Sequence, residues 1–167
     1  MEQPHMDNLE YRPNVGVMVV NKHGKVWLGK RIPKAKHHDL IKRAWQMPQG
    51  GVDEGENLQA AALRELYEET GIKSVTLLGQ SDGWIKYDIP KELVGQVLSG
   101  KFKGQKQMWY CYRFDGDDSE INLQPTEEPA EFEAWRWEDV DKLVDLIVEF
   151  KREVYINVTK QFKQYTL

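Results

Sequence analysis

The sequence predicts an α/β protein in which helices cover both faces of a β-sheet. Short apolar runs typical of strands lie on both sides of a helix-like segment that ends at Gly71. A longer amphipathic segment follows near the C-terminus, from Glu138 to about Tyr165. Because each amphipathic helix must bury one face, this order of elements favours a three-layer α/β/α sandwich.

The size and composition of the chain suit one domain with a substantial core. The chain has 167 residues, of which 40% are hydrophobic, and a chain of this length typically buries about 70% of its unfolded surface. We therefore expect a single domain over residues 1–167, with a core between about residues 11 and 162. The polar residues 1–10 are expected to form a mobile tail.

The sequence also predicts a cytoplasmic protein. The first ten residues contain no apolar run typical of a signal peptide, and no later stretch approaches the ~18 apolar residues of a membrane span. Cys111 is the one cysteine, so no intrachain disulfide can form, which agrees with a reducing compartment. We expect Cys111 to be a small buried side chain in a strand.

The first two strands are predicted at Val15 to Val20 and at Val26 to Lys30, joined by the turn Asn21 to Gly24. A loop is predicted over Arg31 to Arg43, because this segment contains a proline, two histidines and many cations. His37 and His38 are candidate metal ligands, but no third ligand stands at a convincing spacing, and loop residues are the simpler interpretation.

Four further strands and two helices complete the predicted order. A short helix is expected after Pro90, over Lys91 to Leu98, with Ser99 and Gly100 at its end. The C-terminal helix is predicted from apolar residues that recur every three or four positions. The four strands are predicted at Val75 to Leu78, Trp84 to Tyr87, Gln107 to Phe114 and Glu133 to Trp137. The apolar positions of the C-terminal helix are Val140, Leu143, Ile147, Phe150, Val154 and Val158.

The helix that ends at Gly71 is predicted to carry a stripe of carboxylates. A helix advances roughly 100° per residue, so with Glu65 at zero, Glu68 falls near −60° and Glu69 near +40°. The expected core-facing stripe lies on the opposite side. Its members are Leu63, Leu66, Tyr67 and Thr70.

Grouped carboxylates require cations if they are partly enclosed. Two such charges about 5 Å apart repel by roughly 3 kcal/mol at an effective dielectric near 20. Glutamate oxygens are hard ligands, and the stretch contains no Cys or His, so that Mg²⁺ is the expected ion and Mn²⁺ the possible substitute. A solvated acidic helix face is the alternative for three glutamates at this spacing. The glycines, Arg64 and the helix stop at Gly71 favour the metal site.

The stretch from Gly50 to Ile72 resembles the Nudix box of the Nudix hydrolases. It reads Gly, five residues, Glu, seven residues, Arg-Glu-Leu-x-Glu-Glu-x-Gly-Ile, so that every defining position is filled. The resemblance implies a mixed β-sheet within an α/β/α sandwich and an enzyme that hydrolyses a diphosphate linkage, which is an acid anhydride.

The same resemblance implies a role for each residue of the box. It makes Glu65, Glu68 and Glu69 metal ligands, with Glu65 as a candidate for the base that deprotonates the attacking water. It also places Glu56 and Arg64 in an orienting ion pair and brings the carbonyl of Gly50 to a metal.

Segments outside the box resemble the bacterial RNA pyrophosphohydrolases, a branch that also includes dinucleoside polyphosphate hydrolases. The similarity runs from Tyr11 to about Phe162. The segments are Tyr11 to Gly16, Trp45 to Gly51, Gly104 to Gln107, Glu131 to Trp137 and Phe150 to Tyr155.

This branch implies further site residues. Glu131 would supply another carboxylate to the metals, and phosphates would be neutralised by Arg12, Lys106 and Lys151. A base would be stacked by Arg31 and Phe150. Phe150 equally fits a core position of the C-terminal helix, and Arg12 and Lys151 would be ordinary surface charges unless the fold brings them together.

The charges are segregated along the chain, although the net charge is only −4. Between Lys22 and Trp45 there are eight Lys or Arg against one acid, whereas between Asp115 and Asp145 there are twelve acids against two bases. A uniform nucleic-acid-binding coat is excluded, but a local phosphate-binding patch is not; we expect no DNA partner. Solvation alone is the alternative explanation for the basic run.

We therefore predict a metal-dependent hydrolase that removes pyrophosphate from the 5′-triphosphate end of RNA, leaving a 5′-monophosphate and promoting decay. The alternative is a diadenosine polyphosphate hydrolase that releases ATP, and a distant alternative is a non-catalytic nucleotide sensor. The segment Pro33 to Arg43 is long compared with many relatives and leaves the choice of substrate open. We expect a monomer that does not bind membranes; the number of metals, the identity of the base and any protein activator are not fixed by the sequence.

Overall fold

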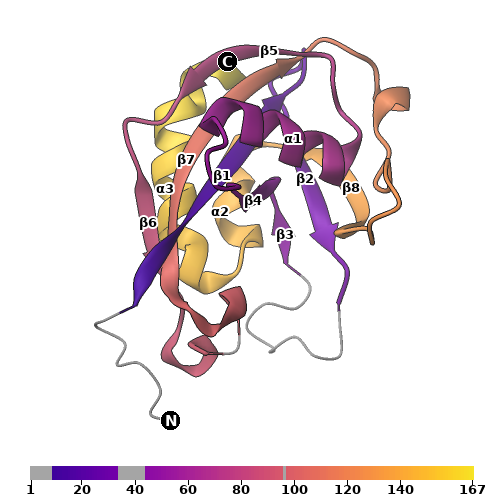
Figure 1. Cartoon of the computed structure of the whole chain (residues 1–167). Coiled ribbons are helices and arrows are strands. Elements are labelled where there is room, and N and C mark those ends of the chain that lie inside the picture. The colour runs from indigo at the N-terminus through magenta and orange to yellow at the C-terminus, as the bar shows by residue number, and fades with distance from the viewer. Residues whose placement is uncertain (1–8, 34–43, 96) are drawn as a thin grey trace.

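The computed structural model describes residues 9–33, 44–95 and 97–167. Most of the predicted loop after Arg31, including His37 and His38, and all but the end of the predicted tail therefore lie outside the described residues. Eight strands form one mixed sheet with helices on both of its faces (Figure 1). None of the described helices is long and apolar enough to cross a membrane.

A parallel pair of long strands forms the centre of the sheet. β1 (Glu10–Val20) and β7 (Phe102–Phe114) are paired over eleven positions, from Glu10 opposite Phe102 to Val20 opposite Arg113. On the far side of β7, β5 (Val75–Gln80) and β6 (Ile85–Asp88) both pair with it in the antiparallel direction.

The other half of the sheet diverges from β1. β2 (Val26–Arg31) contacts β1 at the hairpin end, through Val20 and Val26, and then pairs with β8 (Phe132–Glu138). Two short strands line the gap: β3 (Trp45–Gln46) pairs with β2, and β4 (Gln49–Gly51) pairs with β1. The sheet is therefore open between its two halves at the end opposite the hairpin.

The side chains of β1 alternate between two core layers, one on each face of the sheet. Val15, Val17 and Val19 belong to the core under α1 (Leu58–Thr70). Met18 and Val20 face the opposite side, which is covered by α2 (Leu143–Leu146) and α3 (Arg152–Phe162) (Figure 1). Successive side chains of a strand point to opposite faces, so β1 serves both layers. The predicted α/β/α sandwich is confirmed.

The predicted strands are present, with corrected ends. β1 already begins at Glu10, the last residue of the predicted tail, and β6 lies one residue later than predicted. β7 begins five residues earlier than predicted, because pairing with β1 extends the strand through polar residues that lack an apolar pattern. Cys111 is buried in β7, as predicted.

Both helices predicted after the box are wrong in extent. The segment Lys91 to Leu98 is not one helix but contains separate 3₁₀ turns at Lys91–Leu93 and Leu98–Gly100. The segment after Glu138 is interrupted at Ile147, whose backbone is extended with φ −83° and ψ 154°. The β-branched pair Ile147 and Val148 has low helix propensity, and Ile147 is buried in the core, so the chain breaks here between α2 and α3.

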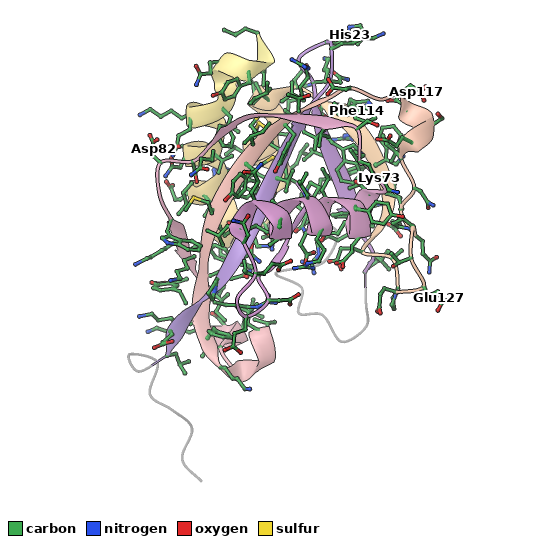
Figure 2. All side chains as sticks on the ribbon, turned by 45° about the horizontal axis from the view of Figure 1, so that its top comes forward. His23, Lys73, Asp82, Phe114, Asp117 and Glu127 are labelled. Atoms are coloured by element: carbon green, nitrogen blue, oxygen red, sulfur yellow. The ribbon has the colours of Figure 1, made fainter. Side chains whose placement is uncertain are left out.

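The acidic connection between β7 and β8 lies away from the β6 side of the sheet. Figure 2 shows Asp117 and Glu127 on this connection and Asp82 on the opposite side of the molecule. Within the connection, the carboxylate of Glu120 accepts hydrogen bonds from the backbone N–H groups of Lys73 and Ser74, both at 3.1 Å. These bonds attach the acidic connection to the end of α1.

Candidate active site

A cavity of about 540 Å³ opens where the two halves of the sheet diverge. It gathers residues from β1, β2, β4, α1, β6, β7 and the turn before α3. The predicted site residues that line it are Arg12, Arg31, Gly50, Glu65, Glu69, Glu131, Phe150 and Lys151.

The helix that carries the glutamates has well-defined ends. The side chain of Asn57 caps its N-terminus by accepting a hydrogen bond from the Ala60 N–H at 3.1 Å. Gly71 ends it in the left-handed conformation, with φ 76°, and donates its N–H to the Tyr67 carbonyl. This conformation favours glycine, which explains the residue at that position of the box.

The buried face of α1 is rotated from the predicted one. Leu63 is exposed and Tyr67 is only half-buried, so the predicted stripe is wrong at these two positions. The buried residues are Ala61, Ala62, Leu66, Glu69 and Thr70. On the same wheel they span roughly −40° to 140°, so Glu69 lies within the buried face, Glu65 near its border, and Glu68 outside it.

Glu65 lies directly against the backbone of β4. A Cβ added at Gly50 would stand 2.0–2.4 Å from the carboxylate atoms of Glu65, so a larger residue at this position would displace the carboxylate. Burial raises the pKa of Glu65, while the neighbouring Arg64 opposes that rise. The pKa of this carboxyl group is therefore moved toward the range that suits a general base.

Glu69 is the most deeply buried of the three glutamates. Glu69 is 8% exposed, and its carboxylate accepts a hydrogen bond from the Gln49 N–H at 3.1 Å. Burial raises its pKa well above the usual value, and the charges of Glu65 and Glu131 add to the effect. The protein thus holds a carboxylate where the anionic form is disfavoured without a nearby cation.

Arg64 organises the carboxylates at the edge of the cavity. Its guanidinium forms a two-pronged ion pair with Glu56, at 2.7 and 2.9 Å. The same group donates to Glu65 at 2.8 Å, to Glu68 at 3.2 Å and to the Gly51 carbonyl at 3.0 Å. The ion pair lowers the pKa of Glu56 to about 2, so Glu56 stays anionic and holds Arg64 in place.

The donor set fits a hard divalent cation in type and charge. Glu65, Glu69 and Glu131 offer carboxylate oxygens to one cavity, and their mutual repulsion contributes to the raised pKa of Glu69. Among residues 9–33, 44–95 and 97–167, no three Asp, Glu, His or Cys side chains are already arranged around a common point. Glu65 and Glu68 are instead turned toward Arg64.

Arg12 and Lys151, which were expected at a phosphate site, line the cavity together with Arg31, which was expected to stack a base. The Lys151 ammonium is buried, and its Nζ lies 3.4 Å from Gln49 Oε1. Burial and the neighbouring Arg31 lower its pKa to about 7. The Nε of Arg31 lies 3.6 Å from Glu131 Oε1. The Arg12 guanidinium lies so close to Gly51 that a Cβ there would be 2.0 Å from Nη2.

Lys106 and Phe150 were both expected to bind substrate, and they lie in different surroundings. Lys106 does not line the cavity; its ammonium lies 4.7 Å from the ring centroid of Trp84. Phe150 lines the cavity and is also packed against the core, with its ring 5.9 Å from that of Tyr87. Phe150 therefore occupies both of the environments considered for it.

A chain of buried amides was not predicted. Gln107 Nε2 donates to Asn14 Oδ1 at 2.8 Å and to Gln49 Oε1 at 3.2 Å. Gln105 Nε2 donates to the Tyr87 hydroxyl at 2.5 Å. Within the described part of the chain, Asn14 Nδ2 and Gln105 Oε1 are buried without a hydrogen-bond partner. Buried unpaired amide atoms are rare, and at a cavity they are candidate ligand contacts. In the sequence, these amides are visible only as polar residues that interrupt the apolar pattern of a strand.

Known proteins resemble this chain in sequence and in fold. The NUDIX domain model matches residues 10–158. The chain is 51% identical over 160 residues to the RNA pyrophosphohydrolase of Agrobacterium fabrum (strain C58), covering 94% of each chain. It is 52% identical to the RNA pyrophosphohydrolase of Brucella anthropi, covering 94% of this chain and 92% of that one.

Solved structures show the same fold at lower sequence identity. A binary complex of a C. elegans Ap4A hydrolase superimposes with a TM-score of 0.62 at 18% identity, covering 92% of this chain and 98% of that one. The E. coli dihydroneopterin triphosphate pyrophosphohydrolase gives a TM-score of 0.59 at 22% identity, covering 87% and 94%. At these identities the structural likeness shows the fold alone.

Proposed function

The chain belongs to the Nudix hydrolases, and from this membership we propose that it removes pyrophosphate from the 5′-triphosphate end of RNA. The observation that carries the proposal is one cavity lined by two glutamates of the Nudix box, Glu65 and Glu69, and by three cations, Arg12, Arg31 and Lys151. The near full-length similarity to RNA pyrophosphohydrolases supports RNA as the substrate.

Nudix hydrolases generally use divalent metal ions, and we propose Mg²⁺ for this chain, with Mn²⁺ as a substitute. Its ligands would come from Glu65, Glu68, Glu69 and Glu131 and from the carbonyl of Gly50, a residue whose Cα side lies against the Glu65 carboxylate. When bound, the ion would neutralise phosphate oxygens and acidify a water. The turn of Glu65 and Glu68 toward Arg64 means that these two side chains would be shared between Arg64 and the metal.

The chain's own groups can perform the remaining steps. The carboxylate of Glu65 is proposed to accept the proton of the attacking water, and Arg64 keeps it oriented through the 2.8 Å hydrogen bond. Water adds to the phosphorus nearest the RNA, the bond to the bridging oxygen breaks, and pyrophosphate leaves. The cations of the cavity offset the charge that develops on the leaving group.

The products would be pyrophosphate and an RNA with a 5′-monophosphate, which would open the transcript to decay. We expect the reaction to take place in the cytoplasm, where such RNA is found. We also expect the protein to act as a monomer.

A second candidate function is hydrolysis of a dinucleoside polyphosphate with release of ATP. The cavity lining also includes four apolar residues, Ile89, Leu93, Val97 and Leu98. An apolar lining of this kind suits the second base of such a substrate. A non-catalytic sensor is less consistent with the site, because a sensor needs neither the buried Glu69 nor the cluster around Arg64.

The test compares the two substrates side by side with Mg²⁺, using 5′-triphosphorylated RNA and diadenosine tetraphosphate at equal concentrations. We expect the RNA to yield pyrophosphate and a 5′-monophosphate end at the higher kcat/KM. A higher kcat/KM for ATP release from the dinucleotide would favour the second candidate. If neither substrate is cleaved, with or without added Mg²⁺ or Mn²⁺, the proposed activity is wrong.

A further inference from the structure

A cluster of three lysines and two aromatic rings lies near one end of the sheet. It consists of Tyr11, Trp84, Lys86, Lys103 and Lys106, here called the lysine–aromatic patch. These residues come from the first residues of β1 and β7 and from β6 with the residue before it, segments that lie side by side in Figure 1. Trp84 is 39% exposed and Lys86 is also exposed.

Most patch side chains point away from the cavity-lining side chains of the same strands. Along β1, β6 and β7, the cavity-lining residues Arg12, Tyr87 and Gln105 directly adjoin the patch residues Tyr11, Lys86 and Lys106. Neighbouring side chains of a strand point to opposite faces, and Lys103, at the register shift between Glu10 and Tyr11, lies beside Tyr11. The patch and these cavity-lining residues are close to the end of the sheet, because β1 begins at Glu10 and β6 ends at Asp88.

The lysines of the patch are arranged at a cost to stability. Lys86 and Lys106 stand directly opposite each other in the antiparallel pair of β6 and β7, and like charges in this position are destabilising. Within the described residues, neither of them, nor Lys103, forms an ion pair with a carboxylate. Asp88, the acid in the adjacent row, accepts the hydrogen bond of the Tyr11 hydroxyl instead.

The ammonium groups are held over aromatic rings. Lys106 lies 4.7 Å from the centroid of Trp84, and Lys86 and Lys103 lie 5.3 and 4.8 Å from the centroid of Tyr11. Cations interleaved with aromatic faces are the combination that binds single-stranded nucleic acid, in which phosphates meet the charges and bases stack on the rings. A polyanion would also relieve the repulsion between Lys86 and Lys106.

We propose that the lysine–aromatic patch binds the single-stranded RNA that follows the 5′ end held in the cavity. This inference rests on the proposed function, because it assigns the path of the same substrate. The RNA would leave the cavity past Arg12 and round the nearby end of the sheet to reach Tyr11. The acidic connection on the other side of the molecule, which carries Asp117 and Glu127 (Figure 2), would repel it and so favour this path.

The experiment compares a long and a short substrate in the full chain. Steady-state kinetics are measured with a 5′-triphosphorylated dinucleotide and with a 5′-triphosphorylated, unstructured RNA of about 12 nucleotides, long enough for one site of this type. The variant Lys86→Ala/Lys103→Ala should raise KM for the long RNA about fivefold to tenfold and leave both constants for the dinucleotide unchanged. Trp84→Ala should raise KM for the long RNA about tenfold through lost stacking.

Salt dependence gives a second, independent measurement. Binding of the same long RNA with a 5′-hydroxyl end is followed by fluorescence anisotropy at several salt concentrations. Each phosphate contact contributes about 0.7 to the slope of log K against log salt for single strands, so the double variant should lower that slope by about 1.4. Lys160→Ala, which removes an exposed lysine of α3 in the other layer, is the matched control and should change neither slope nor KM.

The possible failures can be told apart. If the wild-type chain cleaves neither triphosphorylated substrate, the proposed function fails. If the wild type cleaves both, but the double variant and Trp84→Ala keep its KM and salt slope while remaining folded by circular dichroism, RNA does not use the patch.

Discussion

Replacement of the buried Glu69 by glutamine should lower activity and raise stability at the same time. Glu69→Gln keeps the size of the side chain and keeps an oxygen that can accept the hydrogen bond from the Gln49 N–H. It removes a negative charge that burial, Glu65 and Glu131 all disfavour. The proposed metal site, however, loses one of its ligands.

The magnitudes of the two effects can be estimated separately. Removing one like-charge interaction is worth at most roughly 3 kcal/mol at an effective dielectric near 20, and exchanging a charged acceptor for a neutral one costs about 1 kcal/mol. The free energy of unfolding without metal should therefore rise by roughly 1–2 kcal/mol. At about 2–4 °C per kcal/mol for a chain of this size, Tm should rise by about 2–8 °C. Turnover should fall at least about a hundredfold, which corresponds to ~2.7 kcal/mol of transition-state stabilisation.

The assay combines thermal unfolding with pyrophosphate release at saturating Mg²⁺. Because the pKa of Glu69 is raised in the folded state, its contribution to stability is present below the ordinary value of 4.5 and is lost as pH rises. The stability difference between variant and wild type should therefore grow as pH increases above about 4.5. Glu54→Gln, in an exposed turn, is the control and should change neither quantity. Near wild-type turnover in Glu69→Gln would refute the metal-ligand assignment, and a lower Tm would refute the electrostatic argument.

Three further substitutions test other parts of the site. Gly50→Ala should place a methyl group against the Glu65 carboxylate and lower kcat at least about tenfold. The change in Tm should be small, because the flexible end of the Glu65 side chain can move. An unchanged kcat would show that the position of Glu65 is not critical. In Arg64→Lys, the lysine cannot reproduce the two-pronged ion pair with Glu56. The kcat should therefore fall about tenfold to a hundredfold, as is typical when a residue that orients metal ligands is replaced. A kcat equal to that of the wild type would show that Arg64 has a purely structural role. Lys151→Met removes a buried ammonium group whose pKa is lowered to about 7. The wild type should therefore lose stability relative to the variant as pH falls from 10.5 to about 7, and should lose no more below about pH 7. Urea unfolding at several pH values would measure this, and a constant difference in stability would contradict the burial of a titrating lysine.

The box itself could be read from the sequence because its function depends on local geometry. The spacing of Glu65, Glu68 and Glu69 follows from helix periodicity, and the stop at Gly71 follows from its left-handed backbone. The rotation of the helix against the sheet does not follow from local pattern. Two alanines, Ala61 and Ala62, proved to be buried while Leu63 is exposed, since small side chains let α1 approach β4 closely enough for Glu65 to rest on Gly50.

The remainder of the cavity depends on contacts between distant segments. Gln107 reaches Asn14 and Gln49 only because β7 lies parallel to β1, a pairing between segments about 90 residues apart in the chain. Amides carry no charge and have no strong periodicity, so their sequence signal is weak. The side of the strand on which Lys106 lies was equally invisible, because it depends on the register of β7 with β6 and β1.

The break in the predicted C-terminal helix explains how Lys151 comes to serve the cavity. A continuous helix would run straight through this segment, whereas the extended backbone at Ile147 lets the chain change direction before Phe150 and Lys151. This extended backbone and the 3₁₀ turn Glu149–Lys151 that follows place both side chains on the lining of the cavity. Lys151 is thereby buried beside Gln49, which also binds Glu69 through its backbone. A local break in the helix thus joins the proposed phosphate-binding lysine to the proposed metal ligand through one residue, Gln49.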